Sequence, residues 1–508
     1  MGLTRRSATV GLLGWGAAGL APRRSQAAGA WPSEVSLGPA HPFSFERLQA
    51  DAAALAGRPY RAPPIAPADR VDALDYRPAA SLWNSAHNDQ SVRFFPLERY
   101  ARSPVAMNVV MGGQAREVAY SEALFNIPAG SPKRRPGAGG GFGGFGGFRV
   151  MNADHVTDWL AFLGASYFRS ADPSNQFGLS ARGVAINTAT ADPEEFPAFT
   201  AFWLERDPAG LVVYALLDGP SVAGAYRIAN HRSTAGLVQD VQVSLTFRQP
   251  VKRLGLAPLT SMYWYGRSDR RPSDDWRPQI HDSDGLSIWT GAGERIWRPL
   301  NNPVRVSVNA FVDRNPRGFG LMQRDRNFED YQDDGILYER RPSAWIEPVG
   351  EWGPGSVQLV ELPTNGENDD NIVAFWAPAS APRAGQSLNY RYRLNWTSEE
   401  PGLFGVARAG ATRVGRAGAA SPPGRRKYVI DFAGETLAGL DRNSGVTAAV
   451  EVRPGVAQAV FAYPIVSQKI WRLMFDVDTP PGVTVDMRAY LRQGARALSE
   501  TWVDQAIG

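Results

Sequence analysis

The stretch Asp240–Phe247 reads DVQVSLTF, and its side chains alternate between polar and apolar. Val241, Val243 and Leu245 therefore point to one face of an extended chain, because successive side chains of a strand point to opposite faces. A repeat of two residues is typical of a β-strand that is buried on one side. We predict a strand here, with these three side chains packed into an apolar core.

Similar short runs recur along the chain from Tyr76 onward, separated by turn residues. With 52 glycines and 39 prolines in the chain, turns are frequent. Many short strands with turns between them favour a β-sandwich, so we predict an all-β fold. Helical patterns are scarce, and the two best candidates are Phe45–Leu55 and Asp154–Leu163. The other strand candidates are Ser91–Phe95, Leu211–Leu217, Gln239–Phe247, Val304–Phe311, Val357–Leu362 and Ile372–Trp376.

A second series of strand-like runs follows residue 400, after a segment rich in Gly, Ala and Arg. About 100 residues with five or six short strands suit an immunoglobulin-like sandwich. We therefore predict a large β-sandwich over 31–400 and a small one over 401–508. The runs of the second series are Lys427–Phe432, Val446–Val452, Ala457–Tyr463, Lys469–Val477 and Val483–Leu491.

Two further segments differ from this pattern. Residues 136–148 read PGAGGGFGGFGGF, which predicts a disordered surface insertion or, as the alternative, a flap over a cleft. Residues 1–30 begin with Arg5-Arg6, continue with an apolar run to Leu20 and end in small residues. This layout predicts a signal peptide of the twin-arginine type, cleaved to leave a periplasmic protein. An anchor helix is the alternative, although the run is short and glycine-rich for a membrane span.

The composition excludes several classes of function. The formal net charge is +4, but four arginines and no acidic residues lie in 1–30, so the mature chain is neutral and lacks the field that holds nucleic acid. The chain has no cysteine, which removes thiolate metal sites and cysteine nucleophiles. Its five histidines are scattered without metal-ligand spacing, and no GxSxG motif is present. We therefore expect neither a metal nor a cofactor.

Two acidic turns remain as candidates for chemistry. Pro278–Pro303 reads PQIHDSDGLSIWTGAGERIWRPLNNP, and Glu361–Trp376 reads ELPTNGENDDNIVAFW. Carboxylates on separate loops, with aromatic side chains nearby, are what glycoside hydrolysis requires: one acid for the leaving oxygen and one base for the attacking hydroxyl. Asp and Asn are also ordinary turn formers, so solvated turns are the simpler interpretation of each stretch. Most of the 15 tryptophans are expected in the core, with one or two in a cleft.

At these residues the chain resembles the periplasmic glucans biosynthesis protein family, types G and D, and is more similar to type D. The resemblance extends from Phe43 to Trp502. It is carried by the motifs LGASYF (Leu163–Phe168), GLSARGVAI (Gly178–Ile186), EFPAFTAFW (Glu195–Trp203), YALLD (Tyr214–Asp218), LAPLTSM (Leu256–Met262), HDSDGLSIW, WRPLNNP, NPRGFGLMQ (Asn315–Gln323), RPSAW (Arg341–Trp345) and LSETW (Leu498–Trp502).

The resemblance implies a galactose-mutarotase-like β-sandwich followed by a small immunoglobulin-like sandwich. It also implies an enzyme of osmoregulated periplasmic glucans that acts on linear β-1,2-glucan with inversion, by hydrolysis or by cyclising transglycosylation. Asp370 matches the general acid and Asp282 the general base. The remaining predicted substrate-binding or supporting residues are Glu367, Tyr338, His281, Asp284, Trp289 and Arg298.

Other functions stay open at this point. A non-catalytic glucan-binding protein that assists a membrane glucosyltransferase would use the same residues. A mutarotase-like epimerase would need a histidine acid, for which His281 is the one placed suitably. A homodimer is a further possible assembly.

Overall fold

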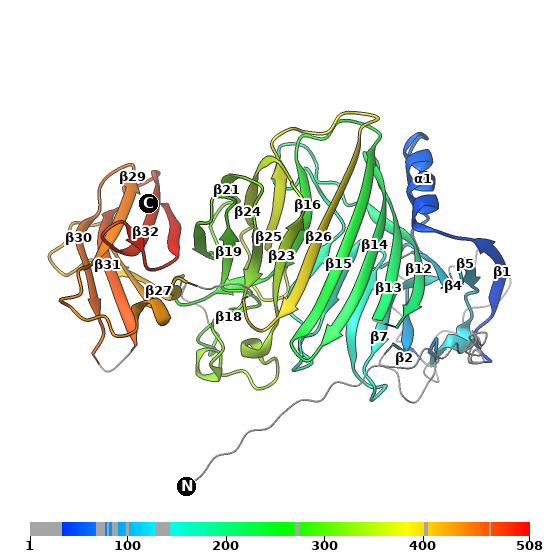
Figure 1. Cartoon of the computed structure of the whole chain (residues 1–508), viewed down its shortest axis with the longest axis horizontal. Helices are drawn as coiled ribbons and strands as arrows, with labels where there is room; N and C mark the ends of the chain where they lie inside the picture. The colour runs from blue at the N-terminus through cyan, green and yellow to red at the C-terminus, as the bar shows by residue number, and fades with distance from the viewer. Residues whose placement is uncertain are drawn as a thin grey trace, which may run out of the picture.

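The computed structural model describes residues 33–67, 77–78, 81–83, 90–97, 101–126, 143–208, 210–269, 275–400, 405–466 and 469–507. The predicted signal peptide lies outside these ranges. Almost all regular structure within them is β-strand, arranged in packed sheets, which confirms the predicted all-β sandwich fold (Figure 1). None of the helices in the described ranges is long and apolar enough to cross a bilayer.

The larger sheet holds 16 of the described strands and runs through most of the molecule. In spatial order these strands are β1 (Leu37–Pro42), β5 (Gln114–Val118), β4 (Ala106–Met111), β12 (Ala198–Asp207), β13 (Gly210–Asp218), β14 (Val222–Ser233), β15 (Gly236–Phe247), β26 (Ser387–Thr397), β23 (Ser343–Val349), β22 (Gly318–Met322), β19 (Gly285–Trp289), β20 (Arg295–Pro299), β34 (Thr501–Ile507), β32 (Thr484–Gln493) and β29 (Val446–Arg453), with β33 (Arg496–Ala497) beside β32.

A second sheet packs against the first part of the larger one. Its described strands, in spatial order, are β21 (Ser307–Arg314), β24 (Pro354–Glu361), β25 (Ile372–Pro378), β16 (Leu254–Ser261), β10 (Ser180–Arg182), β9 (Tyr167–Ser170), β8 (Asp158–Leu163), β7 (Phe145–Met151) and β3 (Val92–Pro96), with β11 (Ala185–Ile186) beside β16. Two short ladders pair β17 (Tyr263–Tyr265) with β18 (Ile280–His281) and β2 (Arg77–Pro78) with β6 (Phe125–Asn126). The 3-10 helices are η1 (Glu122–Leu124), η2 (Phe328–Asp330), η3 (Tyr338–Arg340) and η4 (Glu435–Leu437).

The main core lies between these two sheets. Val241, Val243 and Leu245 of β15 are at most 2% exposed, as their alternation predicts. They belong to one apolar cluster with Phe162 of the second sheet and Trp376 of β25. Each large apolar side chain buried in this way contributes about 1.5–3 kcal/mol, so the alternation fixes which face of β15 turns inward.

Helix α1 (Phe45–Ala56) covers the outer face of the larger sheet (Figure 1). Ser44 caps its N-terminus by accepting a hydrogen bond from the backbone N–H of Arg47. Leu48 and Ala52 are buried and pack with Tyr214 on that face. The predicted helix over Phe45–Leu55 is therefore confirmed.

The second predicted helix, Asp154–Leu163, is wrong. Residues 158–163 form strand β8, which pairs on one side with β7 and on the other with β9. Trp159, Leu160, Ala161 and Phe162 are all buried. A continuous apolar run of this length suits a central strand that is buried on both faces as well as it suits a helix, and packing decided between them.

The C-terminal end of the glycine- and phenylalanine-rich segment forms a strand, although the sequence predicted a disordered insertion or a flap. Phe145 and Phe148 lie in β7, are at most 3% exposed and belong to the main core. Gly147 has a φ of 155° and lies against the backbone of Phe162, so a side chain there would collide with β8. Residues 136–142 lie outside the described ranges.

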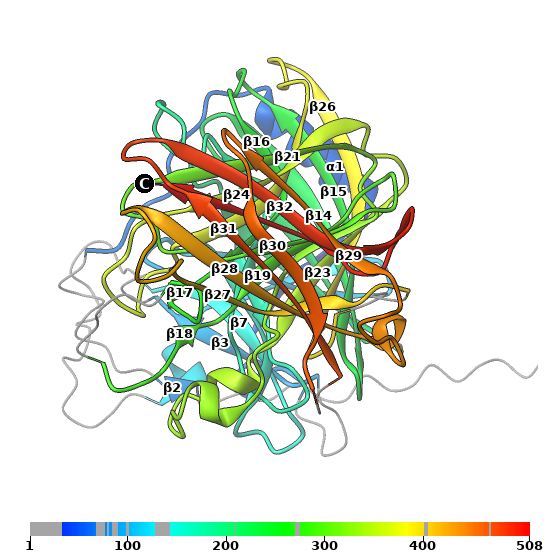
Figure 2. The same cartoon turned by 90° about the vertical axis from the view of Figure 1, so that its left-hand side faces the viewer.

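The strands after residue 405 form a second sandwich at the C-terminal end (Figures 1 and 2). A four-stranded sheet of β27 (Arg408–Arg416), β28 (Arg425–Ala433), β31 (Ile470–Asp478) and β30 (Gln458–Pro464) faces the last strands of the larger sheet. Tyr428, Phe475 and Trp502 form part of a separate apolar core between them. The two parts share one continuous sheet, because β34 pairs in parallel with β20.

Candidate active site

The two acidic turns meet at the short link between β16 and β17. The backbone N–H of Asp282 donates to the carbonyl of Met262 at 2.8 Å. On the next residue, Tyr263, the backbone N–H donates to Oδ1 of Asn371 at 2.8 Å, and the carbonyl accepts from Nδ2 of Asn371 at 3.0 Å. Asp370 directly precedes Asn371. Met262 and Tyr263 therefore hold both turns and bring them close together.

Asp282 is a buried carboxylate that is paired with an arginine. It is 5% exposed and directly follows β18. Arg341, at the end of η3, donates a hydrogen bond to its Oδ1. Burial raises the pKa of Asp282 to about 6, the positive charge of Arg341 opposes this rise, and the negative charge of Asp370 adds to it. Asp282 can therefore exchange a proton near neutral pH.

Asp370 stands at the other side of the site, just before β25, with an exposed side chain. Partial desolvation by the surrounding protein raises the pKa of its carboxyl group, and Asp369 adds to the rise, while Arg169 and Arg341 oppose it. Arg169 and Arg341 also act on Asp282. The two carboxylates thus share two cations and repel each other, an arrangement often found where protons are exchanged.

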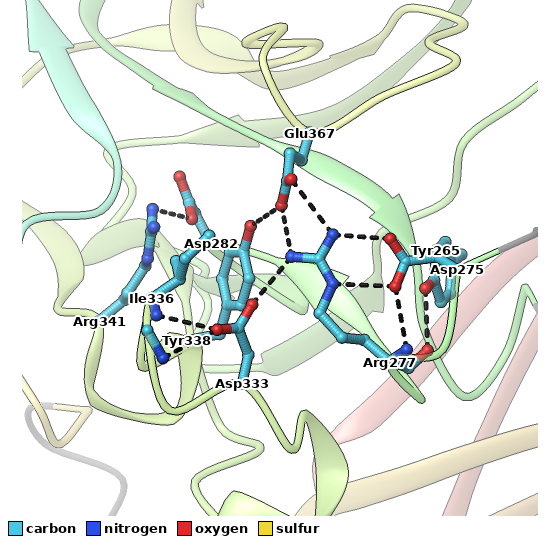
Figure 3. A network of polar contacts seen from close by, with 10 residues as sticks. Tyr265, Asp275, Arg277, Asp282, Asp333, Ile336, Tyr338, Arg341 and Glu367 are labelled. Carbon is cyan, nitrogen blue, oxygen red and sulfur yellow. Dashed lines mark hydrogen bonds and ion pairs between the residues drawn. The ribbon is translucent and has the colours of Figure 1, made fainter.

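A third element of the site is a line of polar contacts that begins at Glu367 (Figure 3). The Tyr338 hydroxyl donates to Glu367 at 2.5 Å, and Arg277 donates two hydrogen bonds to the same carboxylate at 2.7 and 3.2 Å. Arg277 also pairs with Asp275 at 2.7 Å and with Asp333 at 2.9 Å. The guanidinium of Arg341 lies 4.5 Å from the centre of the Tyr338 ring. Glu367 and Tyr338 therefore position the arginine that binds Asp282.

The part that Glu367 plays differs from the expected one. A carboxylate three residues before Asp370 in sequence is expected to raise the pKa of Asp370 by repulsion. Glu367 is instead bound to Arg277, whose hydrogen bonds hold the pKa of Glu367 below its usual range. Asp369 raises the pKa of Asp370 by repulsion, and Asp370 in turn raises the pKa of Asp282.

His281 and Asp284 flank Asp282 and stabilise the turn from inside. His281 is fully buried, stacks on Tyr263 and lies within hydrogen-bond distance of the side-chain oxygens of Gln323 and Gln279. Burial lowers its pKa to about 3, so it is neutral around pH 7 and unsuited to the acid role that an epimerase would require. Asp284 accepts the backbone N–H groups of Arg324 and Asp325.

Trp289 and Arg298 are not among the residues around Asp282 and Asp370. Trp289 lies between two arginines, with Arg295 3.5 Å and Arg317 5.3 Å from the centre of its ring. Arg298 is 2% exposed and forms ion pairs with Glu361 at 3.1 Å and with Asp504 of β34 at 3.2 Å. It therefore connects the two sandwiches.

Sequence reasoning missed three arginines of the site. Arg169 lies in β9, Arg341 follows η3, and Arg277 precedes β18, so only the fold brings them to the acidic turns. Arg341 begins RPSAW and Arg169 follows LGASYF, so both stand in or directly beside a stretch that carries the family resemblance, while Arg277 directly precedes the first acidic stretch. Within the described ranges, no three His, Asp or Glu side chains are grouped so that they could hold a metal.

Comparison with known proteins agrees with the resemblance. The family model described as periplasmic glucan biosynthesis protein, MdoG, matches residues 43–506. The glucans biosynthesis protein D 2 of Ralstonia nicotianae is 44% identical over 497 residues, which cover 93% of this chain and 92% of that protein. The glucans biosynthesis protein D of Stenotrophomonas maltophilia is 46% identical over 488 residues, covering 92% and 90%.

Among solved structures, a polysaccharide lyase aligns with a TM-score of 0.23 and 11% identity, over 72% of this chain and 44% of that chain. A likeness this small bears on neither fold nor activity. The family model spans every residue named in the site. The chain belongs to the periplasmic glucan biosynthesis protein MdoG family, whose members take part in glucan biosynthesis in the periplasm.

Proposed function

We propose that this protein acts on linear β-1,2-glucan with inversion at the anomeric carbon, with Asp370 as general acid and Asp282 as general base. One observation carries the proposal: the turns that bear the two carboxylates are both held at Met262–Tyr263, and both carboxyl groups have raised pKa values. An inverting enzyme needs such a pair, one protonated and one ionised, on opposite sides of the scissile bond. Export by the twin-arginine route, indicated by Arg5-Arg6, would place the enzyme with its substrate.

The surroundings of the two carboxylates suit the two roles. Asp370 is exposed and can reach a leaving oxygen, directly or through a substrate hydroxyl, while its raised pKa retains the proton longer than an ordinary aspartate would. Asp282 is buried and held by Arg341, which favours its ionised form. It would accept the proton of the attacking water, or of a glucan hydroxyl, directly or through intervening waters.

The direct test is incubation of the purified protein with linear β-1,2-glucan, followed by an assay for reducing ends and mass spectrometry. Hydrolysis gives shorter chains with new reducing ends, and cyclisation gives products that lack one water relative to linear chains of the same length. A linear β-1,3-glucan serves as the control for linkage. Unchanged β-1,2-glucan with binding retained would instead favour the non-catalytic glucan-binding protein.

A further inference from the structure

A row of arginines crosses the outer face of the second sheet and leads to the acidic pair. Arg93 of β3 pairs in register with Arg149 of β7, Arg149 with Ala161 of β8, and Ala161 with Arg169 of β9. Residues directly opposite each other in antiparallel strands project from the same face. Adjacent strands lie about 4.8 Å apart, so the three arginines form one line perpendicular to the strands. We call Arg93, Arg149 and Arg169 the arginine row.

The arginine row ends at the candidate active site. Strand β9, which carries Arg169, is joined through β10 and β16 to β25, the strand that begins just after Asp370. The charge of Arg169 also lowers the pKa of both Asp282 and Asp370. Tyr167 lies two residues before Arg169 and on the same face of β9. Burial raises the pKa of Tyr167, and the negative charge of Asp370 adds to this rise, so Tyr167 is also close to Asp370. A chain bound at the acidic pair can therefore continue along the arginine row.

The positive charge of Arg93 and Arg149 is poorly balanced by the residues that the structure describes. Among the described residues, the arginine row forms one ion pair, a long contact of 3.9 Å between Arg149 and Asp158. Nε of Arg149 is buried and has no hydrogen-bond partner in the described ranges. The pKa of Arg93 is lowered, first by burial and then by the charge of Arg149, so the two guanidinium groups repel each other. Among the described residues, Arg93 and Arg149 thus repel each other with Asp158 as their one carboxylate partner, while the charge of Arg169 acts on Asp282 and Asp370.

Aromatic rings hold two of the three guanidinium groups in place. The Arg149 guanidinium lies 5.7 Å from the centre of the Phe95 ring, and that of Arg169 lies 4.9 Å from the centre of the Phe177 ring. Stacking orients a guanidinium group and leaves its N–H donors free at the edges. The donors of a fixed guanidinium group fit the paired oxygens of a carboxylate or a phosphate better than a single hydroxyl.

From this placement we propose that the arginine row binds anionic substituents, carboxylate or phosphate, on the glucan chain whose backbone occupies the acidic pair. The inference rests on the proposed function for the identity of the backbone, and it adds a preference for substituted over neutral chains. The substituent itself takes no part in the chemistry. It pairs with the guanidinium groups and fixes where along the chain the acidic pair acts.

The test measures binding rather than turnover. Isothermal titration calorimetry compares neutral linear β-1,2-glucan with the same chain after random succinylation and, separately, after random phosphorylation. We expect the wild-type protein to bind at least one of the charged chains about tenfold more tightly than the neutral chain at low salt, and to lose this preference in 1 M salt. The two charged chains distinguish carboxylate from phosphate.

Arg93→Gln/Arg149→Gln should remove the preference and leave the affinity for the neutral chain unchanged. Arg149→Gln alone, which disturbs the sheet less, should reduce the preference. Arg314→Gln, an exposed arginine of β21 at the opposite edge of the same sheet, is the matched control and should keep it. Equal dissociation constants of the wild-type protein for all three chains, or a preference that the double variant retains, would overturn the proposal. Failure to cleave any chain would count against the proposed catalysis and leave these affinities valid.

Discussion

Arg341 donates a hydrogen bond to Oδ1 of Asp282, although the two residues come from different segments of the chain. The same guanidinium lies against the ring of Tyr338, which fixes its direction. Because Arg341 lowers the pKa of both Asp282 and Asp370, it shifts the pH range over which each carboxyl group is ionised.

Replacing Arg341 by Gln should therefore move the pH profile of kcat/KM. Without the positive charge the pKa of Asp282 rises beyond its value of about 6, so the proposed base is protonated at a pH where the wild-type protein is expected to act. The acidic limb of the profile should shift to higher pH, and activity should fall more at pH 5.5 than at pH 7.5. Arg341→Lys keeps the charge and should keep the limb near its original position. An unshifted acidic limb in Arg341→Gln would contradict this role.

Arg277 is predicted to stabilise the loops around the site. It pairs with Asp275, Asp333 and Glu367, and its own side chain is 9% exposed. Arg277→Gln leaves three neighbouring carboxylates without their shared cation and should lower the free energy of unfolding by about 3 kcal/mol at pH 7. Urea denaturation measures the difference.

The pH dependence of that loss has a defined sign. The hydrogen bonds of Arg277 lower the pKa of Asp275 and of Glu367, so these groups stabilise the folded state above their ordinary pKa, and the contribution is lost as pH falls through the lowered values. The gap between wild type and Arg277→Gln should therefore shrink toward pH 3. A gap that is constant or widens in acid would show that the carboxylates are not the cause.

Arg324 should hold the C-terminal sandwich against the large one. Its buried guanidinium forms ion pairs with Glu400 and, at 2.9 Å, with Glu500. The same guanidinium lies 3.6 Å from the centre of the Trp297 ring. Arg324→Met leaves two buried carboxylates unpaired, which should cost about 4 kcal/mol. We expect denaturation to separate into two transitions, with the C-terminal part unfolding first. Arg416→Gln, on an exposed arginine of β27, is the control. A single transition at the wild-type midpoint would contradict the assignment.

Asp284 should make the protein less stable as pH rises. Burial and the charge of Asp325 raise its pKa, and Oδ1 of Asp284 lacks a hydrogen-bond partner in the described ranges. The folded state therefore holds a proton that the unfolded state releases, and this contribution to stability is lost as pH rises through the raised pKa. Asp284→Asn should show a smaller decrease in melting temperature between pH 5 and pH 8 than the wild type. Equal decreases would show that another group is responsible.

Local patterns predicted those parts of the fold that local rules decide. The alternation in β15 and the capped helix α1 were readable because one buried face imposes a period on the sequence. Strand β8 was not, since burial on both faces removes the period. The phenylalanines of β7 were hidden in a glycine repeat whose order depends on the neighbouring strand.

The residues of the candidate site fall into the same two groups: those that local sequence predicts and those whose position depends on the fold. Asp282, Asp370, Glu367 and Tyr338 could be proposed from motifs, because the acidic residues stand in turns and the resemblance singles out one position in each. Arg169, Arg277 and Arg341 could not, because their proximity depends on strand register and on a 3-10 helix far away in sequence. Trp289 and Arg298 are close to Asp282 in sequence, but β19 and β20 carry them toward the second sandwich.

The most direct test of the catalytic pair compares Asp370→Asn and Asp282→Asn with the wild type on linear β-1,2-glucan, with products identified by mass spectrometry. Asp334→Asn, an exposed carboxylate on the loop before η3, is the control and should keep the wild-type rate. Loss of a general acid or base costs about 10²–10⁴ in rate, so both site variants should lose at least a hundredfold while still binding the chain. Asp370→Asn protein that forms products at the wild-type rate would contradict the account.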